Sequence, residues 1–175
     1  FEVFPPFTAE PLEKTARFEP TPDPPGKFST GIQDLDRMLD GGYPKGSTVL
    51  LEIDEHISTF QYHLILNPTA WNFLAKGRAI MSIPSSGVDY NILKLRAMEA
   101  EFTEDEFNRL LRIFTFRTPE TSREPCIVKF EGKSIEEDYK KYLKIEEELM
   151  NETGQPVLRI TGADSIIAYY GREAA

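Results

Sequence analysis

The stretch Gly46–Leu64, GSTVLLEIDEHISTFQYHL, decides how the chain is interpreted. Its front half is a short, nearly continuous apolar run of the kind that a strand buried on both faces requires. Its back half begins a helical pattern at about Phe60. Pro68 should kink this helix or divide it in two, because proline lacks an amide hydrogen and clashes with the preceding turn. A strand, a loop and a helix in this order form the setting of a phosphate-binding loop, yet the residues that such a loop uses are missing.

Helical and strand-like segments alternate along the rest of the chain. Apolar runs predict strands at 78–84, 112–116 and 156–162. Apolar residues at helical spacing predict helices near 30–40, 89–102, 103–111 and 134–153. Capping boxes should begin three of these helices, formed by Thr30 with Gln33, Thr103 with Glu106, and Ser134 with Glu137. Strands separated by helices indicate an α/β fold in which helices flank a mainly parallel sheet.

Two of the predicted helices have an apolar stripe that should face the sheet. In 89–102 the stripe consists of Ile92, Leu95, Met98 and Phe102. In 134–153 it consists of Ile135, Tyr139, Tyr142, Leu149 and Met150, and Gly154 should end the helix.

Residues 1–27 precede this pattern and are rich in proline, as in FPPF and EPTPDPPG. Proline fixes φ and removes an amide donor, so this segment should run extended, with its phenylalanines as anchors on a neighbouring surface. Its composition is that of a linker or an arm lying on the domain, and a proline-rich ligand for another protein is the alternative. We therefore divide the chain into an arm at 1–27 and an α/β domain at 28–175.

The composition of the 175 residues limits the kinds of function. With 40% hydrophobic residues, the chain can form one sizeable core, and its net charge of −9 opposes the phosphate contacts of nucleic-acid binding. The single cysteine, Cys126, cannot form an internal disulfide, so a cytoplasmic location is expected. No apolar run approaches the roughly 20 residues that span a bilayer, so no membrane association is expected.

The run Phe28–Glu52, FSTGIQDLDRMLDGGYPKGSTVLLE, resembles the entry segment of the KaiC-like and RadA-like ATPases of the RecA superfamily. In that group a phrase of the form STGIxxLDxxLGGGIPxGS leads into the first core strand. Weaker agreement continues to Gly171, because ADSIIAYYG is similar to the phrase that follows the family's Walker B strand. The resemblance implies a three-layer RecA-like P-loop fold. The family's core normally continues further, so 28–175 is either an incomplete or a minimal version of it.

The resemblance also implies that the phosphate loop is degenerate. A loop of the form G-x-x-x-x-G-K-[ST] needs glycines to curl its backbone, a lysine to neutralise the phosphates and a hydroxyl to hold magnesium. The signature positions here are filled by Ile53, Ser58, Thr59 and Phe60. A shortened alignment can bring Ser58 or Thr59 to the hydroxyl position, but the lysine is absent either way. ATP hydrolysis is therefore not expected.

Two further features oppose the binding and the hydrolysis of a nucleotide at this loop. Glu52, Asp54 and Glu55 would bring negative charge close to a triphosphate. Pro84 and Ser85 stand where the family's second strand ends in an acidic pair that resembles the activator of the attacking water. Since phosphoryl transfer depends on positioning and charge stabilisation, the protein would retain almost none of the required groups.

A small remnant of the nucleotide site is predicted at Asp54, Ser58, Thr59 and Asp164. Asp164 stands at the place of the Walker B aspartate, although an aspartate after a strand is also an ordinary helix cap or turn former. The acidic group Glu52, Asp54, Glu55 and His56 could hold a divalent metal if the loop folded around one, but no ligands from other segments converge on it. We therefore assign neither a metal site nor a catalytic residue.

These observations predict a non-catalytic RecA-like or KaiC-like domain, a pseudo-ATPase that acts as a regulatory, scaffolding or oligomerisation module. Its partners would be other proteins or further copies of itself, with no cofactor, no nucleic acid and no nucleotide. The alternative is a nucleotide- or phosphometabolite-binding protein with a rebuilt loop. In that case ATP and magnesium would contact Ser58, Thr59 and Asp164.

Overall fold

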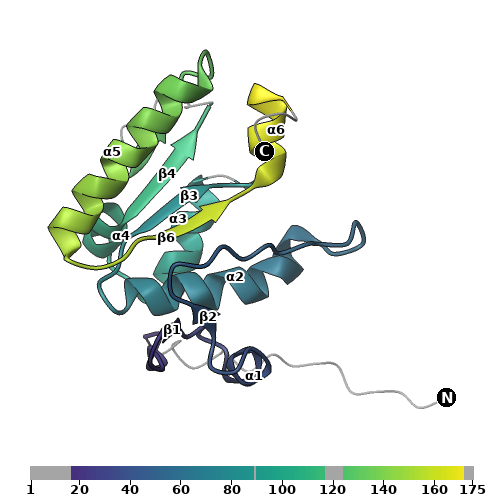
Figure 1. The fold of residues 1–175 in the computed structure, drawn as a ribbon, viewed down its shortest axis with the longest axis vertical. Coiled ribbons are helices and arrows are strands. Elements are labelled where there is room, and N and C mark those ends of the chain that lie inside the picture. The colour runs from purple at the N-terminus through teal and green to yellow at the C-terminus, as the bar shows by residue number, and fades with distance from the viewer. Residues whose placement is uncertain (1–16, 89, 117–123, 172–175) are drawn as a thin grey trace, which may run out of the picture.

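A computed structural model describes residues 17–88, 90–116 and 124–171 (Figure 1). Its centre is a four-stranded parallel sheet, which confirms the predicted α/β class with a parallel sheet flanked by helices. The strands of this sheet are β3 (Ile80–Ile83), β4 (Leu111–Thr115), β5 (Ile127–Lys129) and β6 (Leu158–Thr161). A separate antiparallel pair, β1 (Lys27–Phe28) and β2 (Tyr43–Pro44), was not predicted. The helices are α1 (Gln33–Met38), α2 (Thr59–Leu74), α3 (Tyr90–Glu99), α4 (Glu104–Leu110), α5 (Ile135–Thr153) and α6 (Ala163–Tyr170).

The strand order in the sheet is β5-β4-β3-β6. Strand β3 therefore lies inside the sheet, where Ile80 pairs with both Leu111 of β4 and Leu158 of β6. All four residues of β3 are buried, as a strand covered on both faces requires. The chain builds the sheet outward from β3 to β5 and then returns to the other side of β3.

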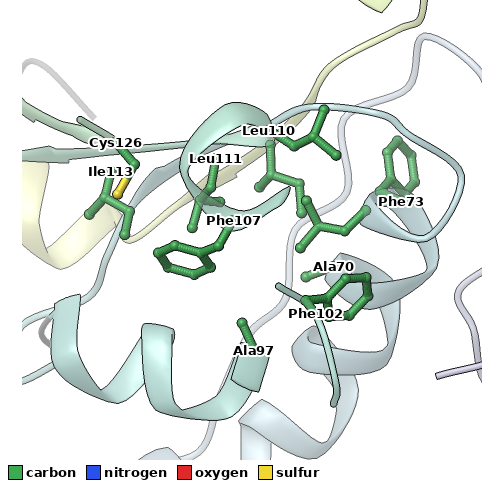
Figure 2. Packing of buried hydrophobic residues seen from close by; sticks show 11 residues of the cluster. Ala70, Phe73, Ala97, Phe102, Phe107, Leu110, Leu111, Ile113 and Cys126 are labelled. Atoms are coloured by element: carbon green, nitrogen blue, oxygen red, sulfur yellow. The ribbon is translucent and has the colours of Figure 1, made fainter. Parts of the chain in front are cut away.

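Helices cover both faces of the sheet, and each face has its own core. One core lies between the sheet and helices α2, α3 and α4, and Figure 2 shows its buried side chains, among them Phe73, Phe107 and Ile113. The other core lies under α5, where Met81 and Phe114 of the sheet meet Tyr142. Neighbouring strand residues such as Ile113 and Phe114 point to opposite cores because side chains alternate along a strand.

The first helix begins differently from the prediction. Its cap residue is Ile32, which makes no side-chain capping bond, so the predicted capping box of Thr30 and Gln33 is wrong. Thr30 instead donates from its backbone N and from Oγ1 to Asp36 Oδ1, both at 2.7 Å, and Ser29 Oγ donates to Asp36 Oδ2 at 2.5 Å. The carboxylate of Asp36 competes successfully for the hydroxyl because it is a charged acceptor.

The segment that contains Ser29 and Thr30 is fixed onto α2. Asn72 Nδ2 donates to the carbonyl of Ser29 at 2.9 Å, and Thr69 Oγ1 donates to the carbonyl of Thr30 at 2.9 Å. Gly31 lies so close to the helix that a Cβ atom would be 2.5 Å from the carbonyl oxygen of Pro68. We predicted a kink or a division into two helices at Pro68; helix α2 is continuous through Pro68, so the division is wrong.

The predicted strand at the front of Gly46–Leu64 is also wrong. Residues 47–53 form neither strand nor helix, and the side chains of this run are exposed. A strand requires a neighbour to pair with its backbone, and no described strand lies beside this segment. The apolar run is therefore an extended, exposed connection between β2 and α2.

The later helices lie close to their predicted positions, but the residues that they bury differ in part from the predicted stripes. Thr103 with Glu106 forms the predicted capping box of α4, Ser134 accepts from Glu137 N at the start of α5, and Gly154 ends α5 in a left-handed conformation. In α3 the predicted stripe is wrong at Ile92 and Leu95, which are exposed, while Ala97 and Leu93 face the core. In α5 the stripe is right at Tyr142 and Leu149, but Ile135, Tyr139 and Met150 are exposed.

The described part of the proline-rich arm lies against the domain. Phe18 packs against the core of α2, α3 and α4, and its N donates to the carbonyl of Ala100 at 3.3 Å. Asp23 forms ion pairs with Lys76 and Arg78, each at 2.6 Å. The anchors predicted at Phe1, Phe4 and Phe7 lie outside the described residues. None of the helices described is long and apolar enough to span a membrane.

Candidate functional site

The carboxyl ends of β3 and β6 lie side by side. Here the direction in which strands are added to the sheet reverses, because the chain goes from β3 to β4 and β5 and then returns to the other side of β3. In open parallel sheets, ligands bind in the crevice outside such a reversal. Gly162 N donates to the carbonyl of Ile83 at 2.7 Å, which joins the two strand ends. A Cβ atom on Gly162 would be 2.6 Å from both the Cα and the N of Ser85, so only glycine fits this contact. The place where a ligand would be expected is therefore closely packed by the chain itself.

Asp164 is the one predicted site residue that lies at this reversal. Its Oδ2 accepts from Ser86 N at 2.7 Å, and the neighbouring Ser165 Oγ donates to the carbonyl of Pro84 at 2.6 Å. Burial would raise the pKa of Asp164, but hydrogen bonds from Ser86, Ser165 and Ser85 hold it below its usual range. The carboxylate is thus ionised, and it holds the loop after β3 against the first turn of α6.

The other three predicted residues lie around the start of α2. Asp54 is exposed, and its Oδ1 accepts from His56 N at 2.9 Å. Ser58 is the cap residue of α2, and Thr59 is the first residue of the helix. Among the described side chains, no hydrogen bond or ion pair joins Asp54 or Ser58 to Asp164. Within the same ranges, no three His, Cys, Asp or Glu side chains gather as a metal site would require.

Ser58 closes the amino end of α2 through a capping box. Ser58 Oγ accepts from Gln61 N at 3.4 Å, and Gln61 Oε1 accepts from Ser58 N at 2.8 Å. The amide groups at a helix start are the ones that bind a phosphate in a phosphate loop. Here the side chains of Ser58 and Gln61 already accept hydrogen bonds from two of the amide groups at the helix start. The sequence contained this signal as Ser58 followed by Gln61, although we predicted no capping box at this position.

Replacing Ser58 by alanine should lower the free energy of unfolding by about 1 kcal/mol, because the amide of Gln61 loses its acceptor. Urea denaturation followed by circular dichroism measures this change. Replacement of Ser58 by aspartate retains an acceptor and is the matched control, expected to stay close to the original stability. Equal loss in both variants would contradict a capping role.

A second constellation, centred on Asp138 of α5, was not predicted. Asp138 is buried, and its carboxylate accepts from Glu131 N at 3.1 Å, Gly132 N at 2.8 Å and the hydroxyl of Tyr170 at 2.5 Å. It therefore joins the loop before α5 to α6. In the sequence this residue stands in an acidic first turn, where an exposed carboxylate that favours the helix dipole is the ordinary interpretation.

A pocket of about 320 Å³ lies next to this constellation, between α5, α6 and β6. Its wall is mostly apolar, and the two charged residues that line it are Asp138 and Arg159. Arg159 is already paired with Glu146 through two hydrogen bonds, and its guanidinium lies 5.7 Å from the ring centre of Tyr142. Burial raises the pKa of Tyr142 to about 12, so this side chain stays neutral. The charged groups of the pocket serve the fold and leave none to recognise a charged ligand.

Comparison with known proteins connects the chain to one family description. Residues 17–100 match the family model described as GvpD basic region 2. The chain is similar to Protein GvpD2 of Halobacterium salinarum, with 32% identity over 99 residues, and to Protein GvpD1 of the same organism, with 39% identity over 67 residues. The two alignments cover 54% and 38% of this chain.

The chain spans only a small part of these relatives, since the alignments cover 20% of Protein GvpD2 and 12% of Protein GvpD1. No solved structure matches the chain. The similarity thus concerns one region of much longer proteins.

The matched region is not basic in this chain. Residues 17–100 contain eight Lys and Arg residues against ten Asp and Glu residues, a net charge of −2. Lys45 lies 5.2 Å from the ring centre of Phe28. The other basic side chains of the region each form an ion pair with a carboxylate: Arg17, Lys27, Arg37, Lys76, Arg78, Lys94 and Arg96. The positive charges of the region are therefore engaged within the domain.

Proposed function

We propose that this chain is a non-catalytic regulatory module of a GvpD-like protein, which acts in gas vesicle regulation through contacts with other proteins. The similarity to Protein GvpD1 and Protein GvpD2 supports the family and the regulatory role. In finer detail, we propose that the module is a RecA-like domain whose nucleotide chemistry has been lost. The resemblance of Phe28–Glu52 to the RecA superfamily and the parallel sheet that follows it support this finer assignment.

The capped amino end of α2 is the observation that most strongly supports a module without nucleotide. A phosphate at this position would have to displace the hydrogen bonds between Ser58 and Gln61. It would also approach the exposed carboxylates of Glu52, Asp54 and Glu55 without a lysine in the loop to neutralise it. Each of these effects opposes the binding of a triphosphate.

The contacts of Asp164 support the same conclusion. A Walker B aspartate must present its carboxylate to a hydrated magnesium ion. In this chain the carboxylate accepts a hydrogen bond from Ser86 N at 2.7 Å, and further bonds from Ser85 and Ser165 lower its pKa. Its acceptor positions are thus directed at the loop after β3. The net charge of −2 over residues 17–100 also argues against a nucleic-acid interface, because phosphate contacts need an excess of positive charge.

Isothermal titration of the protein with ATP and with ADP, each in the presence of magnesium, tests this proposal. We expect no heat of binding at ligand concentrations up to about a millimolar, a range in which a working nucleotide site would be saturated. Binding with micromolar affinity would overturn the pseudo-ATPase assignment. If replacement of Asp164 by alanine then abolished that binding, the rebuilt-loop alternative with Ser58, Thr59 and Asp164 would be the correct one.

A further inference from the structure

Residues 17–24 form an extended strap over the face of the domain that carries α2, α3 and α4. The strap contains neither helix nor strand. Pro20, Pro22 and Pro24 have no amide hydrogen, so the strap cannot pair along its length as a strand does. Phe18 packs against the core of this face. The strap is thus held at separate points, by side chains and by single backbone amides.

Two of these points lie on the helices. At the amino end of the strap, Arg17 forms an ion pair with Glu106 of α4 at 2.5 Å, and both side chains are partly exposed. In the middle, Thr21 N donates to Asn72 Oδ1 of α2 at 2.8 Å. Asn72 is fully buried, and its Nδ2 also holds the carbonyl of Ser29. One amide side chain therefore fixes both the strap and the segment before α1 onto α2.

The third point is the carboxylate of Asp23, whose ion pairs with Lys76 and Arg78 are largely buried. Lys76 Nζ donates to Oδ1 and Arg78 Nη2 donates to Oδ2, each at 2.6 Å, and Ser29 N donates to Oδ1 at 3.0 Å. The three charged side chains are between 12% and 16% exposed. Removal of this carboxylate would leave two cations unpaired. Asp23 therefore contributes more to the attachment of the strap than the exposed pair of Arg17 does.

The closed position of the strap also carries a cost at Arg78. The guanidinium lies 4.9 Å from the ring centre of Phe28 and 5.3 Å from that of Phe73. Its Nε and Nη1 are buried, and they find no acceptor among the described residues. Buried donors without an acceptor raise the free energy of the closed form, and this cost ends when water reaches them. Opening of the strap therefore recovers part of the free energy that is lost with the ion pairs of Asp23.

We propose that residues 17–24 are a strap that opens as a unit while the parallel sheet stays folded, and that Asp23 is its latch. A segment that is held at a few points opens at a lower free energy than the core that it covers. Opening frees the charges of Lys76 and Arg78, which the strap itself neutralises in the closed form. The strap thereby controls whether these two cations are available for contacts beyond the domain. This device goes beyond the proposed function and does not depend on the nucleotide titration.

Native-state hydrogen exchange of the full chain, followed by NMR at urea concentrations below the unfolding transition, tests the opening. The amides of Phe18 and Thr21, whose hydrogen bonds fix the strap, are compared with the amides of β3. We expect protection factors at least about tenfold lower for the strap, with little dependence on urea, because a local opening exposes little surface. Equal protection and an equal dependence on urea would mean that the strap opens only with the whole domain, and would overturn the proposal.

The variant Asp23→Ala tests the latch. It should lower the protection of the Phe18 and Thr21 amides by at least about tenfold, while the spectrum of β3 and β4 stays that of the folded sheet. The control Asp34→Asn removes one carboxylate from an exposed ion pair with Arg37 and should change the protection of the strap by less than about twofold. Unchanged protection in Asp23→Ala, or an equal loss in the control, would overturn the latch. Loss of the folded-sheet spectrum in Asp23→Ala would also overturn the proposal, because the sheet must stay folded when the strap is open.

Discussion

Replacing Asp138 by alanine is expected to lower the free energy of unfolding by about 3 kcal/mol. The substitution leaves Glu131 N, Gly132 N and the hydroxyl of Tyr170 without their acceptor, in a position where Asp138 itself is only 5% exposed. Since these three donors come from the loop before α5 and from α6, both elements should loosen together. Urea denaturation followed by far-ultraviolet circular dichroism measures the loss.

The matched control for this prediction is Tyr170→Phe, which removes one donor and leaves the carboxylate with its two backbone partners. It should cost about 1 kcal/mol, the ordinary value of one hydrogen bond. An Asp138→Ala variant no less stable than Tyr170→Phe would contradict the central role of the carboxylate.

The pH dependence of the free energy of unfolding tests the contribution of the Asp138 carboxylate independently. Burial alone would raise its pKa, but hydrogen bonds from Tyr170, Gly132 and Glu131 hold it below the usual range in the folded state. A lowered pKa means that the unfolded chain binds the proton more readily, so the contribution of Asp138 is complete above a pH of about 4. That contribution should disappear as the pH falls through the lower folded-state pKa. The stability difference between the original protein and Asp138→Asn should therefore shrink below about pH 4, and a constant difference would contradict this mechanism.

Replacing Gly162 by alanine is the second change with a large expected effect, a loss of about 2–3 kcal/mol. The backbone of Gly162, with φ −76° and ψ 104°, is one that alanine adopts readily. Alanine lowers the conformational entropy of the unfolded chain, and this effect alone would make the variant slightly more stable. The loss arises instead because the new Cβ would be 2.6 Å from the Cα and N of Ser85, while the bond from Gly162 N to Ile83 holds the strand end in place.

The variant Ser85→Gly distinguishes a clash with the side chain of Ser85 from a clash with its backbone. Of the three Ser85 atoms nearest to the added Cβ, this change removes only Oγ, at 2.7 Å, while Cα and N remain. The combination of Gly162→Ala with Ser85→Gly should therefore recover little of the lost stability in thermal denaturation. Full recovery, or a Gly162→Ala variant as stable as the original, would contradict a clash with the backbone.

The elements that the sequence predicted correctly are those whose local pattern agrees with their neighbours. The apolar runs of β3, β4 and β6 each find a paired strand, so the pattern of a buried strand led to the right structure. Helix α5 has a capping serine, a long polar face and a terminal glycine, all of which are local signals. The parallel arrangement followed from the alternation of helices and strands.

The wrong predictions arose where a local pattern needs a distant partner. The run Val49–Leu51 has the composition of a buried strand, but composition does not reveal whether another strand lies beside it. In α3 the apolar residues are spread around the helix, so periodicity alone could not choose between Leu95 and Ala97 as the buried position.

The candidate site was predicted only in part for a related reason. Asp164 was recognised because the resemblance places it at the Walker B aspartate, but its bond to Ser86 depends on the pairing of β6 with β3. Asp138 was missed because its partners Gly132 and Tyr170 lie on two other segments. Ser58 could have been found, since its capping partner Gln61 is three residues away.

The order of strands in the sheet has a consequence for how the chain folds during synthesis. Strand β3 can pair with β4 soon after Thr115 has been made, but its other edge waits for Leu158–Thr161. Pairing between segments so distant in sequence is slow compared with helix formation. Until β6 arrives, the inner edge of β3 is open to other unfolded chains, which is a hazard for aggregation. Newly made protein should therefore benefit most from chaperone protection in the interval between the synthesis of β4 and that of β6.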